Sequence, residues 1–124
     1  MIAADASSIV AYLKGERGRD VDRVEEATAS GDLILPPVVV TELYSDPASA
    51  EWADYELAKF QLLPLENDYW RRAGQTRQIL VRHGLKAKVA DTLIAQACID
   101  HDVALITRDR DFRHFAKHCG LKLA

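Results

Sequence analysis

Short apolar runs alternate with helical patterns along this chain, and the alternation restricts the folds that it can adopt. The runs are three to five residues long, too short for helices, and most lack the polar alternation of a half-exposed strand. Such strands are typical of a parallel sheet covered on both faces. The sequence therefore predicts an α/β fold, a parallel β-sheet flanked by helices on both faces, with strands at 2–4, 33–35, 61–65 and 103–106.

Two further features refine this sheet. The run "LKL" at 121–123 predicts a fifth strand. Pro64 lies within the third run, and because proline donates no ladder hydrogen bond, this strand is expected at the edge of the sheet.

Helices are expected between the strands. Ser7 or Ser8, Asn67 and Asp111 are placed to cap the first turns of three of them. The stretch after Pro37 is ambiguous, because three successive valines favour a strand whereas the proline favours a first helical turn, and we expect a helix. The expected helices cover about 8–13, 21–30, 38–45, 48–60, 68–82, 89–101 and 112–118.

Size and charge bound the function. A length of 124 residues predicts one domain, 1–124. The net charge of −3 argues against a protein that coats nucleic acid with a basic face, although it allows a local basic rim. The opening residues "MIAADASSIV" are unlike a signal peptide, and no apolar run is long enough for a membrane span.

The two cysteines suggest no disulfide framework, so a reduced, cytoplasmic compartment is expected. Cys98 lies in an apolar helical pattern and is expected to be a buried free thiol. His114, His118 and Cys119 are close in sequence, but no second Cys or His cluster completes a metal site.

Two acidic residues directly follow predicted strands. Asp5 follows the first strand and Asp109 the fourth, and open parallel sheets bind ligands at the carboxyl ends of their strands. Asp5 equally suits a helix N-cap or a turn. Thr107 and Asp109 point the same way in an extended chain, as does Asp111, but Asp111 has a role as a helix cap.

Two more acids lie on apolar helix faces. Glu42 shares a face with Val38 and Val39, unless it faces solvent at a frayed helix end. Asp91 is the first residue of a stripe at i, i+3, i+4 and i+7 whose other three members are apolar. This position indicates either a site residue or a first-turn aspartate that serves only the helix dipole. That stripe comprises Asp91, Ile94, Ala95 and Cys98.

These four acids are expected at the same edge of the sheet. Two carboxylates about 4 Å apart repel by roughly 4 kcal/mol at an effective dielectric constant near 20, so a cation is needed to hold them together. Oxygen ligands favour Mg²⁺ or Mn²⁺.

The chain resembles the PIN-domain nucleases, and within them the VapC-type toxins of type II toxin–antitoxin pairs. The matching motifs are "DASSIV", "VVVTEL", "ADTLIAQA" and "LITRDRDF", which occur in the family's order and span nearly the whole chain. Ala6 departs from the Thr of many members. The resemblance implies a Mg²⁺- or Mn²⁺-dependent endoribonuclease that cleaves RNA with metal-activated water. It also implies a homodimer and a cognate antitoxin partner.

The resemblance also implies roles for individual residues. Asp5, Glu42, Asp91 and Asp109 match the family's catalytic, metal-binding quartet, and Ser7 and Thr107 match its supporting hydroxyls. Asp111 matches a frequent family aspartate, so its role stays open between metal site and helix cap.

The basic residues near the acids and four aromatic residues each have two possible roles. The basic residues near the acids either hold RNA phosphates or are solvated surface charges: Arg108, Arg110, Arg113, Lys86 and Lys88. Four aromatic residues either belong to the core or line a groove for the antitoxin: Trp52, Tyr55, Tyr69 and Trp70.

Other classes share parts of the pattern. A receiver-type phosphoacceptor domain needs paired acids after the first strand, where "AADAS" offers one. A phosphatase of the haloacid dehalogenase type needs an aspartate two positions after Asp5, where Ser7 stands. A non-catalytic binding module gives no reason for Asp91 on an apolar stripe. A PIN nuclease outside toxin–antitoxin pairs remains the nearest alternative.

Overall fold

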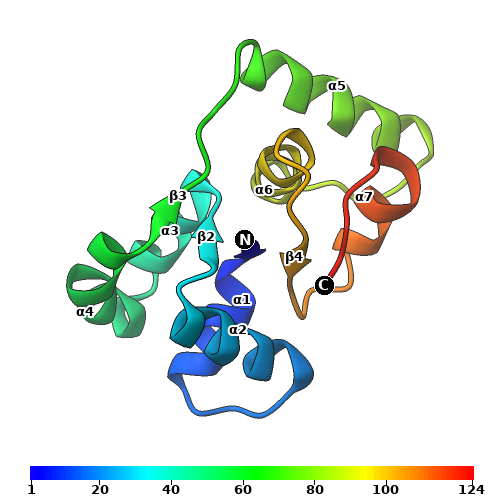
Figure 1. Ribbon diagram of the computed structural model, residues 1–124. Coiled ribbons are helices and arrows are strands. Elements are labelled where there is room, and N and C mark those ends of the chain that lie inside the picture. Colours follow the sequence, from blue (N-terminus) through cyan, green and yellow to red (C-terminus); the bar gives the residue numbers. More distant parts are fainter.

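The computed structural model describes the backbone of residues 1–124 and every side chain except that of Lys59. Its four strands form one parallel sheet in the order β3-β2-β1-β4, as the alternation predicted (Figure 1). In the central register, Ala3 pairs with Ile34 on one side and with Leu105 on the other. The strands are β1 (Ile2–Ala4), β2 (Leu33–Leu35), β3 (Gln61–Leu62) and β4 (Leu105–Ile106).

The edge of the sheet differs in part from the expectation. β3 is the edge strand that Pro64 predicted. The predicted strand 121–123 is wrong as a strand, because only a single bridge pairs Leu123 with Leu105. Both β3 and β4 are shorter than predicted: β3 ends at Leu62, so that Pro64 lies beyond it, and β4 starts at Leu105 and not at Val103.

Helices cover both faces of the sheet. In Figure 1, α1 and α2 lie on one face, and α5 and α6 lie on the other, where α7 packs against both. The ambiguous stretch after Pro37 is helical, and the proline occupies its first turn. The helices are α1 (Ala6–Leu13), α2 (Arg19–Ser30), α3 (Pro37–Ser45), α4 (Pro47–Glu56), α5 (Tyr69–Arg82), α6 (Val89–Asp100) and α7 (Phe112–Cys119), with a 3₁₀ turn, η1 (Leu57–Lys59).

Two helices begin with other cap residues than Ser7 or Ser8 and Asn67. Asp5 caps α1 in place of a serine, because its extended backbone lets its carboxylate accept the Ser8 N–H at 3.2 Å. The residue before α5 is Asp68, in a left-handed conformation with φ of 59°, and not Asn67. Asp111 occupies the cap position of α7, but its side chain accepts no capping hydrogen bond.

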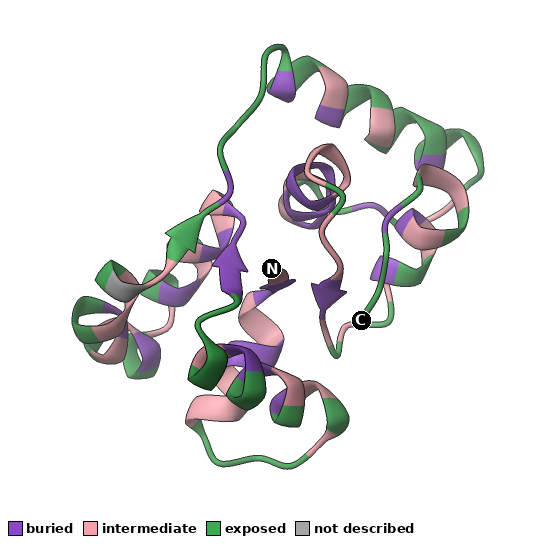
Figure 2. Cartoon of the chain, viewed as in Figure 1, coloured by how far each residue is buried: buried purple, intermediate pink, exposed green. Residues whose placement is uncertain are grey.

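The core lies on both sides of β1. Ala3 and Ala4 are completely buried, and α6 is buried along most of its length, as Figure 2 shows. The predicted stripe of Ile94, Ala95 and Cys98 is at most 1% exposed. Because this packing fixes α6 against the sheet, the first turn of α6 is held beside the carboxyl ends of β1 and β4.

None of the described helices has both the length and the apolar composition that crossing a membrane requires.

Candidate metal centre

Asp5 is held rigidly at the end of β1. Its residue is 4% exposed, and both carboxylate oxygens accept hydrogen bonds. One oxygen accepts the Ser7 hydroxyl at 2.7 Å and the Ser8 N–H, and the other accepts the Thr107 hydroxyl at 2.6 Å. Burial raises the pKa of Asp5, and these hydrogen bonds oppose that rise because they favour the ionised form.

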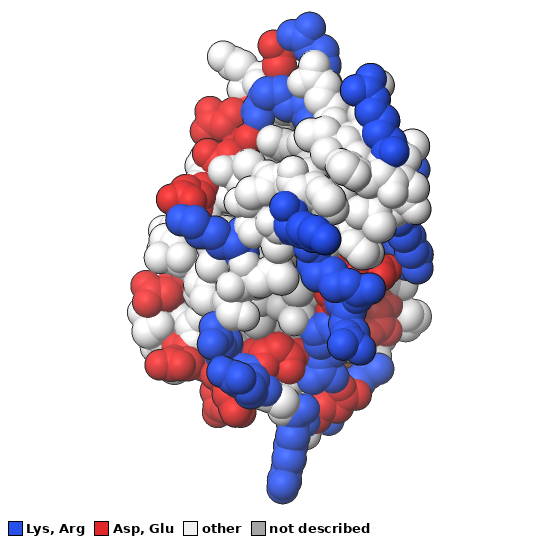
Figure 3. Space-filling model, turned by 90° about the vertical axis from the view of Figure 1, so that its right-hand side faces the viewer, with Lys and Arg blue, Asp and Glu red and all other residues white. Residues whose placement is uncertain are grey.

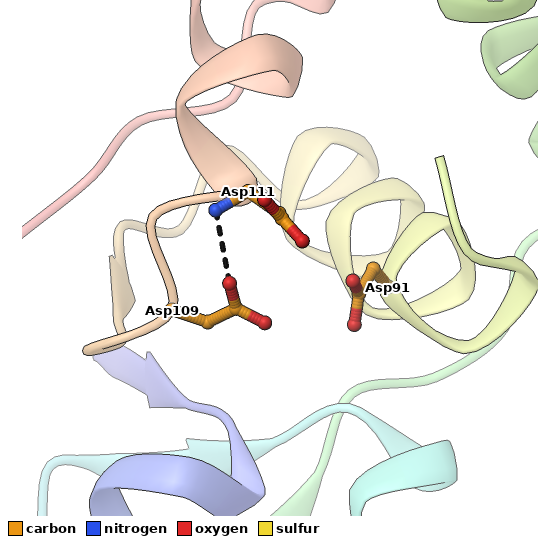
Figure 4. Close-up of side chains that lie close together, drawn as sticks. All are labelled: Asp91, Asp109 and Asp111. Carbon is orange, nitrogen blue, oxygen red and sulfur yellow. Dashed lines mark hydrogen bonds between the residues drawn. The ribbon is translucent and has the colours of Figure 1, made fainter. Parts of the chain in front are cut away.

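The segment after β4 continues from this anchor. The Asp109 N–H donates to the Thr107 hydroxyl oxygen at 3.0 Å, and the Asp111 N–H donates to Asp109 Oδ1 at 2.9 Å. The chain therefore turns so that two carboxylates leave it on the same side, as Figure 4 shows. Asp91, from the first turn of α6, completes a group in which one oxygen of each of the three residues lies within 4.8 Å of the others.

The carboxylates of Asp91 and Glu42 accept no hydrogen bond from any described side chain or backbone group. Asp91 is 8% exposed, and Glu42 Oε1 is buried without a partner. Burial raises the pKa of Asp91 to about 6, with a further rise from Asp109 that Lys88 partly offsets. Burial also raises the pKa of Glu42, and the charges of Asp5, Asp91 and Asp109 add to it.

The four acids predicted from sequence thus lie near enough to repel one another. Asp111, whose role the sequence left open, lies at the cap position of α7 and has a carboxylate oxygen close to those of Asp91 and Asp109. The donor set consists of carboxylate oxygens, one of them buried and unsatisfied, which suits a hard divalent cation. Within the described residues, His114, His118 and Cys119 form no comparable group, and His118 stacks on His83 with ring centroids 4.3 Å apart.

The predicted basic residues differ in their surroundings. Lys86 Nζ lies 3.3 Å from Asp111 Oδ2, and Lys88 precedes α6. Arg110 and Arg113 line a shallow hollow of about 220 Å³ beside Asp109. Arg108 also lines this hollow, and its guanidinium pairs with Glu16 and with Asp20 near the start of α2. Figure 3 shows Lys and Arg side chains gathered on the face that carries α7, with acidic side chains between them.

The aromatic residues divide between core and surface. Tyr69 is buried and donates its hydroxyl hydrogen bond to the Leu93 carbonyl oxygen. Trp52 is half-buried against Phe60. Tyr55 and Trp70 are exposed.

Comparison with known proteins places this fold. The sequence model of the PIN domain family matches residues 2–118. No curated protein matches the chain. Among solved structures, the chain is similar to VapBC2 from Rickettsia felis bound to a DNA fragment from its promoter (20% identity, 100% of this chain and 98% of that chain, TM-score 0.75).

Two further structures share the fold. One is FitAcB from Neisseria gonorrhoeae (21% identity, 99% and 96% covered, TM-score 0.77). The other is DNA-bound VapBC from Salmonella typhimurium (16% identity, 100% and 98% covered, TM-score 0.70). Since the family match extends over almost the entire sheet-and-helix unit, including every acid of the cluster, the chain belongs to the PIN domain family.

Proposed function

We propose that this protein is a divalent-metal-dependent endoribonuclease that acts as the toxin of a type II toxin–antitoxin pair. PIN domains are nucleases that hydrolyse phosphodiester bonds, which supports the reaction class. The observation that carries the metal requirement is the buried, unpartnered Glu42 Oε1 among three other carboxylates that repel it. Such an oxygen is costly to leave buried without a partner, and a bound cation would offset both its desolvation and the repulsion.

The proposed metal site contains Asp5, Glu42, Asp91 and Asp109, with Asp111 as a further acid. It would hold Mg²⁺ or Mn²⁺, because both prefer oxygen ligands. Bound there, the cation would supply Lewis acidity, which lowers the pKa of a water molecule and offsets charge on a phosphate oxygen.

The chain's own residues prepare the site. Ser7 and Thr107 donate to Asp5, which favours its ionised, metal-binding form and fixes its orientation. The Asp111 N–H fixes Asp109 in the same way. Arg110, Arg113, Lys86 and Lys88 would attract the phosphates that flank the scissile bond. In the proposed hydrolysis a water oxygen bonds to phosphorus and the P–O3′ bond breaks, which leaves a 5′-phosphate and, once the leaving oxygen is protonated, a 3′-hydroxyl. The ribose 2′-hydroxyl takes no part, so no 2′,3′-cyclic phosphate forms.

The proposed partners are a cognate antitoxin and a second copy of this chain. The similarity to VapBC and FitAB structures, together with the VapC-like motifs, supports an antitoxin. A hollow of about 210 Å³ between α3, α5 and α6 offers an apolar surface for it. Its lining includes Pro37, Val38, Leu65, Trp70 and Leu93.

The experiment that tests the reaction uses purified protein and a fluorogenic RNA, with Mg²⁺, with Mn²⁺ and with chelator. We expect cleavage that depends on the metal and is lost in Asp91→Asn, whereas the exposed Glu25→Gln serves as the matched control and keeps full activity. Finding 2′,3′-cyclic phosphate ends, or full cleavage in chelator, would contradict the proposal.

A second experiment separates a toxin from a PIN nuclease of another kind. The protein is co-expressed with the product of the adjacent upstream gene. We expect a stable complex without RNA cleavage, and light scattering should show a dimer for the free protein. A neighbour that neither binds nor inhibits this chain would remove the toxin role and leave the nuclease.

A further inference from the structure

Arg108 is bound by two acids on its own chain. Its Nε and Nη2 donate to the two carboxylate oxygens of Asp20 at 2.8 and 3.2 Å, and its Nη1 donates to Glu16 at 2.6 Å. The Asp20 side chain is 14% exposed, and the bidentate geometry is the strong form of this interaction. One positive charge thus faces two negative ones, so the Arg108 guanidinium is already engaged by carboxylates of its own chain.

The ion pair between Arg108 and Asp20 belongs to a path of hydrogen bonds that the backbone between Thr107 and Arg108 closes. Asp20 Oδ2 also accepts the Ser8 hydroxyl at 2.9 Å, and the Ser8 N–H donates to Asp5. The other oxygen of Asp5 accepts the Thr107 hydroxyl, and Thr107 is the neighbour of Arg108 in the chain. The path therefore joins the ends of β1 and β4 to the starts of α1 and α2, and it passes through an acid of the proposed metal site.

The backbone beside this path leaves little room. A Cβ atom added at Gly18 would lie 2.5 Å from Asp20 Oδ1 and 3.2 Å from Arg108 Nη2. The carboxylate and the guanidinium are thus packed against a residue without a side chain. The hydrogen bond from Arg108 also lowers the pKa of Asp20, so the pair stays ionised at neutral pH.

We infer that Arg108 is a positioning residue: paired with Asp20 and Glu16, it fixes the ends of β1 and β4 so that Asp5 and Asp109 keep the arrangement that binds metal. This inference rests on the proposed function. It assigns Arg108 a role different from that of Arg113, whose Nη1 contacts only the Arg110 carbonyl oxygen within the chain that the structure describes.

The test compares Arg108→Gln with Arg113→Gln, and uses Asp20→Asn as a second variant that keeps the shape of the side chain. Thermal melts over a Mn²⁺ titration give metal affinity without activity, and steady-state RNA cleavage gives kcat and KM. Groups that only orient metal ligands typically contribute about 10- to 100-fold to affinity or activity. We therefore expect Arg108→Gln and Asp20→Asn to weaken Mn²⁺ binding and lower kcat by about tenfold or more, with KM within about twofold.

The control should behave in the opposite way. Arg113→Gln should keep Mn²⁺ affinity and kcat and should raise KM. The inference is overturned if Arg108→Gln raises KM alone, or if it lowers the melting temperature in chelator while Mn²⁺ affinity and kcat stay at wild-type values. A wild-type protein that binds Mn²⁺ without cutting RNA would overturn the proposed function, and the Mn²⁺ titration would still decide the role of Arg108.

Discussion

The two ends of α6 carry largely buried aspartates with opposite surroundings. At its C-terminal end, the Asp100 carboxylate accepts three hydrogen bonds. Arg72 donates two of them, from Nη1 and from Nη2, the latter at 2.8 Å, and the Gln96 side-chain amide donates the third at 2.9 Å. The hydrogen bonding to Arg72 lowers the pKa of Asp100. At the N-terminal end, Asp91 has no donor among the described residues, and burial raises its pKa to about 6.

The difference shows what each carboxylate does for the protein. The helix dipole favours the charge of Asp91 and disfavours that of Asp100, yet Asp100 is the ion that the fold stabilises. Asp100 therefore acts as a structural ion that joins α5 to α6. Asp91 lies among like charges, so an uncharged residue of the same shape would stabilise the fold at least as well.

The largest expected effect is on RNA cleavage. Asp91→Asn should lower kcat by at least about 100-fold, because loss of a ligand should exceed the 10- to 100-fold typical of groups that orient ligands. Asp100→Asn should keep kcat within about threefold, because Asp100 lies at the far end of the helix. Single-turnover cleavage of one RNA by both variants, each tested below its melting temperature, checks this. Equal losses would abolish the comparison.

Stability should respond in the reverse order. Asp100→Asn should lower the free energy of unfolding by about 2 kcal/mol, less than the 3–5 kcal/mol of a fully buried pair because the Arg72 side chain is 32% exposed. Asp91→Asn should leave it unchanged or raise it by about 1 kcal/mol, since one repulsive charge is removed. Urea unfolding in chelator measures both. A clear loss in Asp91→Asn would make Asp91 structural as well.

The pH dependence sharpens the same contrast. Asp91 has a folded pKa of about 6 against an ordinary value of 3.8, so between these values the native state holds a proton that the unfolded chain has released. In chelator, the stability of the wild type should therefore fall as pH rises from about 4 to 6, by about 1–2 kcal/mol. Asp91→Asn should reduce this slope and leave the part that comes from Asp5 and Glu42, whose pKa values burial also raises. A wild type whose stability rises over this range would contradict the assignment.

Asp100 affects the free energy of unfolding at lower pH than Asp91 does. Its folded pKa lies below the ordinary value, so its contribution is complete above the unfolded pKa and is lost as pH falls through the folded one. Asp100→Asn should remove this acid-side loss and leave the slope between about pH 4 and 6 in place. Urea unfolding over a pH series resolves the two.

The smallest effect concerns Glu42, which shares the surroundings of Asp91 on another helix. Glu42→Gln should change the free energy of unfolding in chelator by no more than about 0.5 kcal/mol, because a half-buried charge is lost and an amide gains no partner. Urea unfolding checks it beside the exposed Glu25→Gln. A loss above about 2 kcal/mol would show that Glu42 is held by the fold and belongs with Asp100.

Local patterns were enough to predict the sheet, its edge strand and the position of Asp91, because the stripe from Asp91 to Cys98 lies within one helix. The same reasoning left the role of Asp111 open, since a cap and a site acid occupy the same kind of position. The partners of Arg108 are 88 and 92 residues away, and Arg72 is 28 residues from Asp100. No periodicity relates such residues, so only the fold brings them together.

The most direct test of the central claim is a set of thermal melts of wild type, Asp91→Asn and Asp100→Asn, each in chelator and in saturating Mn²⁺. A ligand that binds only the folded state stabilises it by about 2.7 kcal/mol at a hundredfold excess over its Kd. The account predicts that Mn²⁺ raises the melting temperature of the wild type and of Asp100→Asn by similar amounts, and that Asp91→Asn loses most of the rise. An Asp91→Asn variant that keeps the full Mn²⁺ shift would contradict the metal centre.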